Sequence, residues 1–328
     1  MATAEHVKAL IRSHAERDDA RFYTIALQVA AHEARTGHTK FAQELKRVID
    51  DARERTQAAP PREARVVSMA QPRGELAGLL TVEYPKVRLV NMALDADVRA
   101  RLDRVLLEQR QQERIREHGF APLRKLLLVG PPGTGKTMTA SVIAAELGLA
   151  LFTIQLDGLI TKYMGETAAK LRLIFDAIRQ TRAVYLFDEF DAVGGRRASG
   201  NDVGEIRRVL NSFLQFLEQD ESESLVLGAT NHAEILDCAL FRRFDAVIEY
   251  RLPSSEIAEQ VLKARLALLS TKNVVWRTVV QAAQGLSHAD LTRACESAAK
   301  DAILAHRLSI DTEALTRAIG ERRSMHRT

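Results

Sequence analysis

Residues 124–137 read Arg-Lys-Leu-Leu-Leu-Val-Gly-Pro-Pro-Gly-Thr-Gly-Lys-Thr. An apolar run ends at Gly130, and the spacing G-x-x-x-x-G-K-T then closes on Lys136 and Thr137. The apolar residues of 138–147 follow the spacing of a helix that packs on a sheet. Strand, glycine-rich loop and helix in this order are the context in which such a loop binds phosphate. The sequence therefore predicts a nucleotide-binding loop rather than an ordinary glycine-rich turn with an exposed lysine.

The chemistry of this loop follows from its residue types. Glycines let consecutive backbone N–H groups approach phosphate oxygens closely, and the following helix adds the positive end of its dipole. We expect Lys136 to reach the β- and γ-phosphates of a nucleotide and the Thr137 hydroxyl to ligate Mg²⁺. The residues expected to contact the nucleotide are Pro131, Pro132, Gly133, Thr134, Gly135, Lys136, Thr137 and Met138.

Composition limits the class of protein. Of the 328 residues 46% are hydrophobic and 27% are charged, which is typical of a soluble globular protein. No apolar run is long enough to cross a membrane, and the N-terminal residues lack the apolar core of a signal peptide. The isolated Cys238 and Cys295 predict small buried side chains rather than a disulfide or a metal pair. We therefore expect a cytoplasmic protein with no membrane contact.

Four segments of the chain differ in character. Residues 1–55 carry apolar positions at helical spacing and predict an N-terminal helical domain. Residues 56–91 are rich in proline and glycine and predict a linker that ends in a short edge strand. Residues 92–253 predict a large α/β domain, and residues 254–328 predict a small, purely helical C-terminal domain.

The large domain shows the alternation of an α/β fold. A long charged helix is predicted from Asp95 to His118, ended by Gly119. After the glycine-rich loop, helical segments alternate with strand-like runs at 151–156, 183–187, 225–229 and 246–250. Such alternation predicts a parallel sheet flanked by helices. Ligands of such sheets bind beyond the carboxyl ends of the strands, where residues 130–137 are expected.

Two adjacent carboxylates, Asp188 and Glu189, follow the apolar strand at 183–187. Beside a phosphate-binding loop, Asp188 is expected to hold Mg²⁺ together with Thr137. Glu189 can polarise a water molecule for in-line attack on the γ-phosphate. The pair therefore indicates hydrolysis rather than nucleotide binding alone.

Polar residues also flank the two remaining strands: Asn231 follows the run at 225–229, and Arg242 and Arg243 precede the run at 246–250. Asn231 is expected between the other strand ends, where it could orient the same water, although Thr-Asn is also common turn chemistry. Arg242 and Arg243 would be ordinary surface residues in a monomer. Presented to the γ-phosphate of a neighbouring subunit, they would stabilise the charge of the transition state.

Together these motifs resemble the AAA ATPase family over roughly residues 92–310. Residues 130–137 resemble the Walker A motif, Asp188-Glu189 resembles Walker B, and residues 230–245 resemble the second region of homology. The resemblance implies a homo-oligomeric ring, usually a hexamer, with ATP and Mg²⁺ at the subunit interfaces.

The resemblance also implies roles for individual residues. Asn231 would be sensor 1, and Arg242 and Arg243 would be arginine fingers that act on the next subunit's nucleotide. The two arginines are adjacent here, whereas many members separate them, so either one remains a candidate. His288 stands where many members have a glycine, which implies a place near the adenosine. A conventional sensor-2 arginine is not evident. Arg293 lies about one helical turn after His288, and the sequence leaves open which face of the helix it occupies.

Residues 162–166 resemble the first pore loop of AAA ATPases that thread proteins. The expected substrate-gripping residues are Tyr163, Met164 and Gly165. Residues 194–201, with their glycines and charges, would be a second pore loop, although any mobile loop has this composition.

The sequence as a whole predicts a Mg²⁺-dependent ATPase whose ring remodels or threads polypeptide substrates through a central pore. The sequence has no H-E-x-x-H motif and no serine-hydrolase elbow, so proteolysis would require a separate protease. Residues 1–55 would recruit that protease or an adaptor, or would pack on their own enzyme. The alternatives are a nucleic-acid-associated loader, which the modest net charge of +4 does not exclude, and a nucleotide-gated scaffold.

Overall fold

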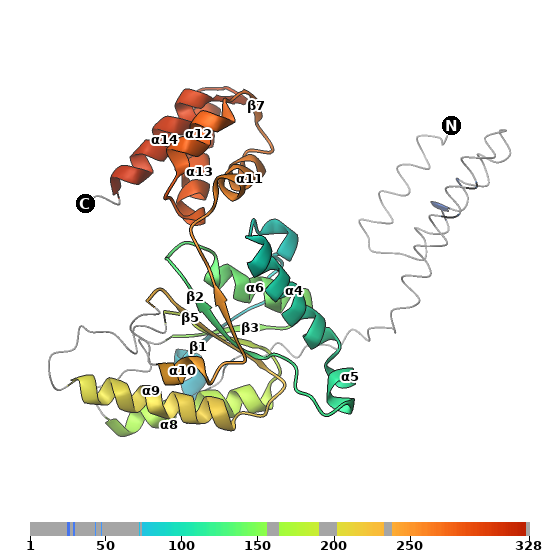
Figure 1. Ribbon diagram of the computed structural model, residues 1–328, viewed down its shortest axis with the longest axis vertical. Coiled ribbons are helices and arrows are strands. Elements are labelled where there is room, and N and C mark those ends of the chain that lie inside the picture. Colours follow the sequence, from blue (N-terminus) through green and yellow to red (C-terminus); the bar gives the residue numbers. More distant parts are fainter. Residues whose placement is uncertain are drawn as a thin grey trace. The chain divides into compact units, whose positions relative to one another are not determined.

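The computed structural model describes residues 74–155, 164–189, 202–232 and 238–325, with a few isolated positions before them (Figure 1). The chain divides into two compact units, Met1–Met69 and Ala70–Thr328. The predicted N-terminal helical domain at 1–55 lies almost wholly outside the described residues. The helices and strands labelled in Figure 1 all belong to the second unit.

A six-stranded sheet forms the centre of this unit, in the order β1-β3-β4-β5-β2-β6. Only β1 is antiparallel to its neighbour, and the other pairs are parallel. The bounds are β1 Leu80–Glu83, β2 Lys125–Val129, β3 Leu151–Ile154, β4 Val184–Phe187, β5 Leu225–Thr230 and β6 Ala246–Glu249. The predicted α/β fold is thus confirmed, including the edge strand, which is β1.

Helices cover both faces of the sheet (Figure 1). On one face, α8 (Met164–Gln180) and α9 (Asp202–Gln219) pack through an aromatic cluster that includes Phe175, Phe187 and Phe213. On the other face, α4 (Ala96–Arg110) and α6 (Lys136–Leu147) bury Leu102 and Ile143. Every residue of β2, β4 and β5 is buried, which explains their nearly continuous apolar sequences.

The prediction of a single helix from Asp95 to His118 is wrong, because this segment forms two helices. The structure has α4 and then a separate α5 (Gln112–Glu117), with Gln111 between them at φ −108° and ψ 22°. No residue of α5 is buried, so packing does not hold this segment in line with α4. Gly119 follows with a φ of 79°, as suits a residue that ends a helix.

The C-terminal part has its own apolar core. Four helices build it: α11 Ser255–Arg265, α12 Trp276–Ala283, α13 His288–Leu304 and α14 Thr312–Met325. The prediction of helices alone is wrong, because β7 (Ser270–Asn273) pairs in parallel with β8 (Ser309–Asp311). Both strands are short and polar, and Ile310 is their only buried residue, so no apolar alternation reveals them.

The remaining described helices are the short η1 (Gly74–Gly78), η2 (Leu89–Asn91) and α10 (Cys238–Phe241). Within the described ranges, none of the helices has both the length and the apolar character that crossing a bilayer requires.

Candidate active site

The glycine-rich loop lies between β2 and α6 and is packed closely from two sides. A Cβ atom on Gly130 would lie 2.3 Å from the carbonyl oxygen of Tyr250. A Cβ atom on Gly133, whose φ is 74°, would lie 2.5 Å from the Ser287 hydroxyl. Glycine is therefore required at both positions by space and, because φ is 149° at Gly130 and 74° at Gly133, also by conformation.

Lys136 connects the loop to a neighbouring strand end. Its Nζ donates hydrogen bonds to the carbonyl oxygens of Gly130 (2.7 Å) and Pro131 (2.9 Å) and to Oδ1 of Asn231 (2.8 Å). Only 6% of Lys136 is exposed. The ammonium group is thereby held inside the mouth of the loop, and Asn231, which follows β5, meets it there.

Thr137 and Asp188 meet at the same edge of the sheet. The Thr137 hydroxyl donates to Oδ2 of Asp188 at 2.7 Å. Two hard oxygen atoms so close together fit the shared coordination of Mg²⁺, which prefers such ligands.

Glu189 follows Asp188 in an uncommon backbone conformation. Its φ is 51°, one of two positive values among the described non-glycine residues, and its N–H donates to Oδ1 of Asp188 at 2.9 Å. The Glu189 side chain is exposed. Such strained conformations persist where the surrounding structure fixes them and often occur at functional sites.

A cavity of about 510 Å³ joins these groups. The loop contributes Lys136 and Thr137, and the strand ends contribute Asp188, Glu189 and Asn231. Its remaining wall comes from α11 and α13 and includes Arg265, His288, Ala289, Thr292, Arg293 and Glu296. Arg293, whose orientation the sequence left open, therefore lies on the same cavity as the predicted catalytic groups.

His288 lines both this cavity and an adjoining one of about 730 Å³. The second cavity is bounded by Met92, Ala93, Met138 and Val261 among others. Burial lowers the pKa of His288, an effect that the nearby Ala93 backbone and Asp95 carboxylate oppose. Neither ring nitrogen is hydrogen-bonded within the part of the chain that the structure describes. A neutral imidazole is thus the favoured form near neutral pH.

The start of α13 is attached to the loop. The Ala289 N–H donates to the Gly133 carbonyl oxygen at 3.0 Å. Ser287 caps the helix through reciprocal hydrogen bonds with Asp290. The capped helix end therefore holds the C-terminal helices against the glycine-rich loop.

Arg242 and Arg243 do not join the other predicted site residues. Both precede β6, and β6 runs parallel to β2, so they lie beside the start of β2 rather than its end. Asp245 fixes this placement, because its carboxylate accepts hydrogen bonds from the N–H groups of Arg124 (2.9 Å) and Lys125 (2.8 Å). The glycine-rich loop begins at the other end of β2, roughly 13 Å away at about 3.3 Å per residue. The two arginines therefore lie at the sheet edge opposite their own chain's loop.

The predicted pore residues are only partly described. Tyr163 and residues 194–201 lie outside the described part of the chain, and Met164 and Gly165 form the first positions of α8.

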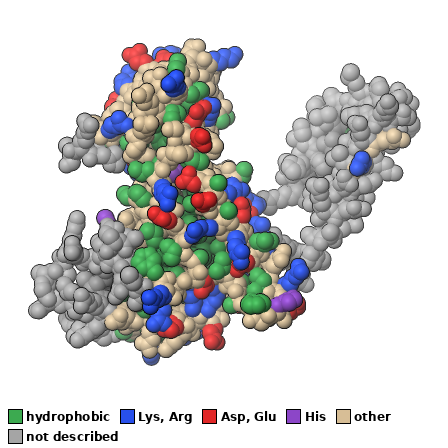
Figure 2. Space-filling view, in the orientation of Figure 1, with side chains coloured by type: hydrophobic (Ala, Val, Ile, Leu, Met, Phe, Trp, Pro, Cys, Tyr) green, Lys and Arg blue, Asp and Glu red, His purple; other side chains and the backbone are tan. Residues whose placement is uncertain are grey.

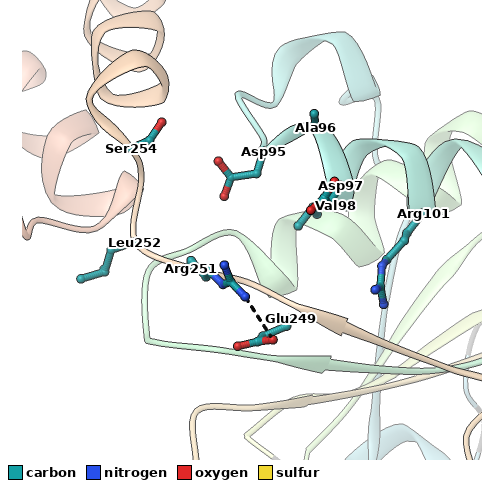
Figure 3. Close-up of a pocket in the computed structure, with 9 residues that line it drawn as sticks. All are labelled: Asp95, Ala96, Asp97, Val98, Arg101, Glu249, Arg251, Leu252 and Ser254. Carbon is teal, nitrogen blue, oxygen red and sulfur yellow. Dashed lines mark ion pairs between the residues drawn. The ribbon is translucent and has the colours of Figure 1, made fainter.

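Another cavity, of about 450 Å³, contains none of the predicted site residues. Asp95, Asp97 and Arg101 approach it from the start of α4 (Figure 3). Opposite them Arg251 and Glu249 form an ion pair of 3.7 Å. The cavity is bounded by the segment that connects β6 to α11, so it belongs to the connection between the sheet and the C-terminal helices.

Comparison with known proteins agrees with this geometry. Residues 126–252 match a family described as "ATPase family associated with various cellular activities (AAA)". An uncharacterized AAA family ATPase, y4kL of Sinorhizobium fredii, is 33% identical over 97% of this chain and 95% of its own length. A proteasome-activating nucleotidase of Pyrococcus abyssi is 31% identical over 74% of this chain, which spans 63% of that protein. The ATP-dependent zinc metalloprotease FtsH of Acidothermus cellulolyticus is 33% identical over 72% of this chain, which spans only 37% of that protein. The full-length match, the matched domain and the converging loop, carboxylates and asparagine together show that the chain belongs to the AAA family and is an ATPase.

Proposed function

We propose that this ATPase works with Mg²⁺ as a ring of identical subunits that remodels or threads polypeptide substrates. The observation that carries the hydrolytic part is the convergence of Lys136, Asp188 and Asn231, from three separate segments, on one cavity. Phosphoryl transfer depends on positioning and on charge stabilisation, and this arrangement supplies both.

Each side chain in the cavity has a distinct task in the proposed reaction. Lys136 holds the β- and γ-phosphates, and Thr137 and Asp188 would hold Mg²⁺, which neutralises phosphate charge when bound. Glu189 accepts a proton from the attacking water, and Asn231 orients that water. Arg293 adds a positive charge from the same chain, since it lines the same cavity.

The nucleotide site is completed by a second subunit in this proposal. Arg242 and Arg243 lie at the sheet edge opposite their own loop, so they are suited to a neighbour's γ-phosphate rather than their own. An arginine supplied in this way typically accelerates phosphoryl transfer by roughly 10³–10⁵-fold. A closed ring, with a hexamer as the expected size, gives every loop such a neighbour.

The proposed substrate is a polypeptide. Relatives of this chain include proteins named for proteasome activation and for ATP-dependent proteolysis, and a 26S proteasome regulatory subunit 10B homolog of Arabidopsis thaliana is 34% identical over 61% of this chain. By analogy, Tyr163, Met164 and Gly165 would grip an extended chain in the pore. Residues 1–55 would bind an adaptor or a separate protease.

The described part of the face in Figure 2 gives the nucleic-acid alternative no support. Figure 2 shows Lys and Arg interspersed with Asp and Glu over the described part of the face in view, without a continuous basic strip. Electrostatic binding of nucleic acid relies on such a strip.

The hydrolytic assignment is tested by Glu189→Gln, with Glu321→Gln at an exposed position of α14 as the matched control. We expect the first variant to lose roughly 10²–10⁴-fold in kcat while it still binds ATP, because only the proton acceptor is lost. The control should keep wild-type turnover. Wild-type turnover by Glu189→Gln would refute its role as the base.

The remodelling assignment is tested by Tyr163→Ala. Basal ATP hydrolysis should persist, and ATP-driven unfolding of a tagged model substrate should be lost. Unfolding at the wild-type rate would show that Tyr163 does not grip the substrate. Capture with Glu189→Gln in ATP should then identify the bound polypeptide.

A further inference from the structure

We propose that Glu218 is a positioning residue that holds Arg243, so that Arg242 is the arginine presented to the neighbouring subunit's nucleotide. This inference rests on the proposed trans-acting site and divides the work between two adjacent arginines. It concerns residues on three segments: the end of α9, the turn before β6 and the start of β2.

The two arginines differ in their contacts. The Arg243 guanidinium forms an ion pair with the Glu218 carboxylate in the last turn of α9. Arg242 is exposed, and it forms no ion pair with any residue in the described ranges. The donors of Arg242 are therefore available to an incoming anion, whereas those of Arg243 already face a carboxylate.

Besides the ion pair with Glu218, the turn that carries Arg242 and Arg243 is also hydrogen-bonded to the start of β2. Asp245 accepts hydrogen bonds from the backbone of Arg124 and Lys125, and its own N–H donates to the Lys125 carbonyl oxygen at 2.8 Å. The Arg124 guanidinium in turn forms an ion pair with the fully buried Asp220, directly after α9. Residues 242–245 are thus held between the sheet and the end of α9.

The charge of Glu218 explains why Arg243 is unsuited to contact the γ-phosphate of a neighbouring subunit's nucleotide. If Arg243 reached a γ-phosphate, Glu218 would either follow it and repel the phosphate or lose its partner. A guanidinium is planar and directional, so fixing Arg243 restricts the turn and thereby the direction of Arg242. The ion pair is largely solvent-exposed, with 39% of the Arg243 side chain and 57% of the Glu218 side chain accessible. Such pairs contribute little to stability, so the expected effect is on turnover.

A charge exchange separates positioning from direct contact. The variants are Glu218→Arg, Arg243→Glu and the double exchange, with Glu221→Arg as an exposed control just beyond α9. Each single reversal should lower kcat by roughly two- to fivefold, since an exposed ion pair contributes up to about 1 kcal/mol, without changing the KM for ATP. The double exchange restores an ion pair of opposite polarity, so kcat should return to within about twofold of wild type. The control should remain at wild-type turnover.

The result that overturns the inference is a double exchange no more active than Arg243→Glu alone, because Arg243 would then contact the phosphate itself. Single reversals without any effect would overturn it too. Should a reversal disturb assembly, Glu218→Gln keeps the size of the side chain and removes its charge. That variant should show a smaller loss of kcat in particles of wild-type mass, and an unchanged kcat would count against positioning.

Arg242→Ala separates this inference from the proposed function. Wild-type turnover in Arg242→Ala, alongside a severe loss in Arg243→Ala, would reverse the assignment of the two arginines and leave the trans site intact. Wild-type turnover in both alanine variants would instead reject the trans site.

Discussion

The Thr137 hydroxyl and the Asp188 carboxylate share a 2.7 Å hydrogen bond although 51 positions separate them in the chain. Parallel pairing of β2 and β4 with β5 brings their segments to one edge of the sheet. Asp188→Asn keeps the size of the side chain and removes the negative charge that a divalent cation requires. We expect the Mg²⁺ concentration for half-maximal ATPase activity to rise roughly tenfold or more, as loss of a ligand charge weakens a cation site.

Titration of ATPase activity with MgCl₂ at fixed ATP measures this change. Asp176→Asn, in a solvent-accessible ion pair on α8, is the control. An unchanged Mg²⁺ requirement in Asp188→Asn would contradict the assignment of Asp188 as a metal-holding residue.

Asn231 accepts a hydrogen bond from Lys136 and lines the same cavity as Glu189. If it orients the attacking water, Asn231→Ala should reduce kcat by roughly 10–100-fold with a smaller effect on ATP affinity. Steady-state kinetics and equilibrium binding of a fluorescent ATP analogue separate the two quantities. Asn211→Ala, at an exposed position of α9, should change neither. A loss confined to binding would assign Asn231 to holding Lys136 rather than to the chemical step.

The lowered pKa of His288 predicts a pH dependence of stability. As pH falls, His288 takes up a proton near pH 6.5 in the unfolded chain, whereas in the folded protein the buried imidazole does so only at a lower pH. Stability should therefore decline as pH falls through about 6.5 towards the folded-state pKa, and it should not depend on this group above that range. His288→Asn should flatten the decline of Tm between pH 7.5 and pH 5.5, which differential scanning fluorimetry measures.

His306→Asn is the matched control for His288. His306 is exposed and has a φ of 55°, a conformation that asparagine tolerates. Its replacement measures how far the loss of a solvent-exposed histidine alone changes the slope of Tm against pH. Parallel slopes for wild type and His288→Asn would show that His288 does not contribute to acid sensitivity.

Asp245 belongs to the stretch that resembles the second region of homology, but the sequence alone predicts no role for it. The structure shows that it anchors the start of β2. It satisfies two backbone N–H groups at the start of β2. Asp245→Ala should lower the free energy of unfolding by about 0.5–1.5 kcal/mol, the net contribution of such hydrogen bonds where water can partly replace the lost partner. Urea denaturation measures this change, and Asp176→Ala, in an exposed ion pair, should stay within about 0.5 kcal/mol of wild type. Equal stability of the two variants would argue against the anchoring role of Asp245.

Sequence was informative where one local pattern determines the outcome. Buried central strands such as β2 and β5 are nearly continuous apolar runs. The glycine-rich spacing that begins at Gly130 predicts both a turn and phosphate binding. Strands β7 and β8 have no such pattern, since their pairing depends on the helices that bring them together.

Long-range contacts explain the features that sequence left open. That Arg293 lines the cavity depends on how α13 rests on the loop through Ala289 and Gly133. The difference between Arg242 and Arg243 depends on Glu218, which lies 25 positions before Arg243 in the chain. No local spacing encodes such contacts, whereas side-chain geometry reveals them.

The central claim is that each active site is shared between two subunits, and mixing two inactive variants tests it most directly. Lys136→Ala lacks a working loop but keeps its arginines, and Arg242→Ala keeps its loop but lacks the trans-acting arginine. Each should be nearly inactive alone, whereas an equal mixture that exchanges subunits should regain activity at roughly a quarter of its interfaces. Mixed particles, verified by mass, that stay as inactive as their parents would contradict the shared site.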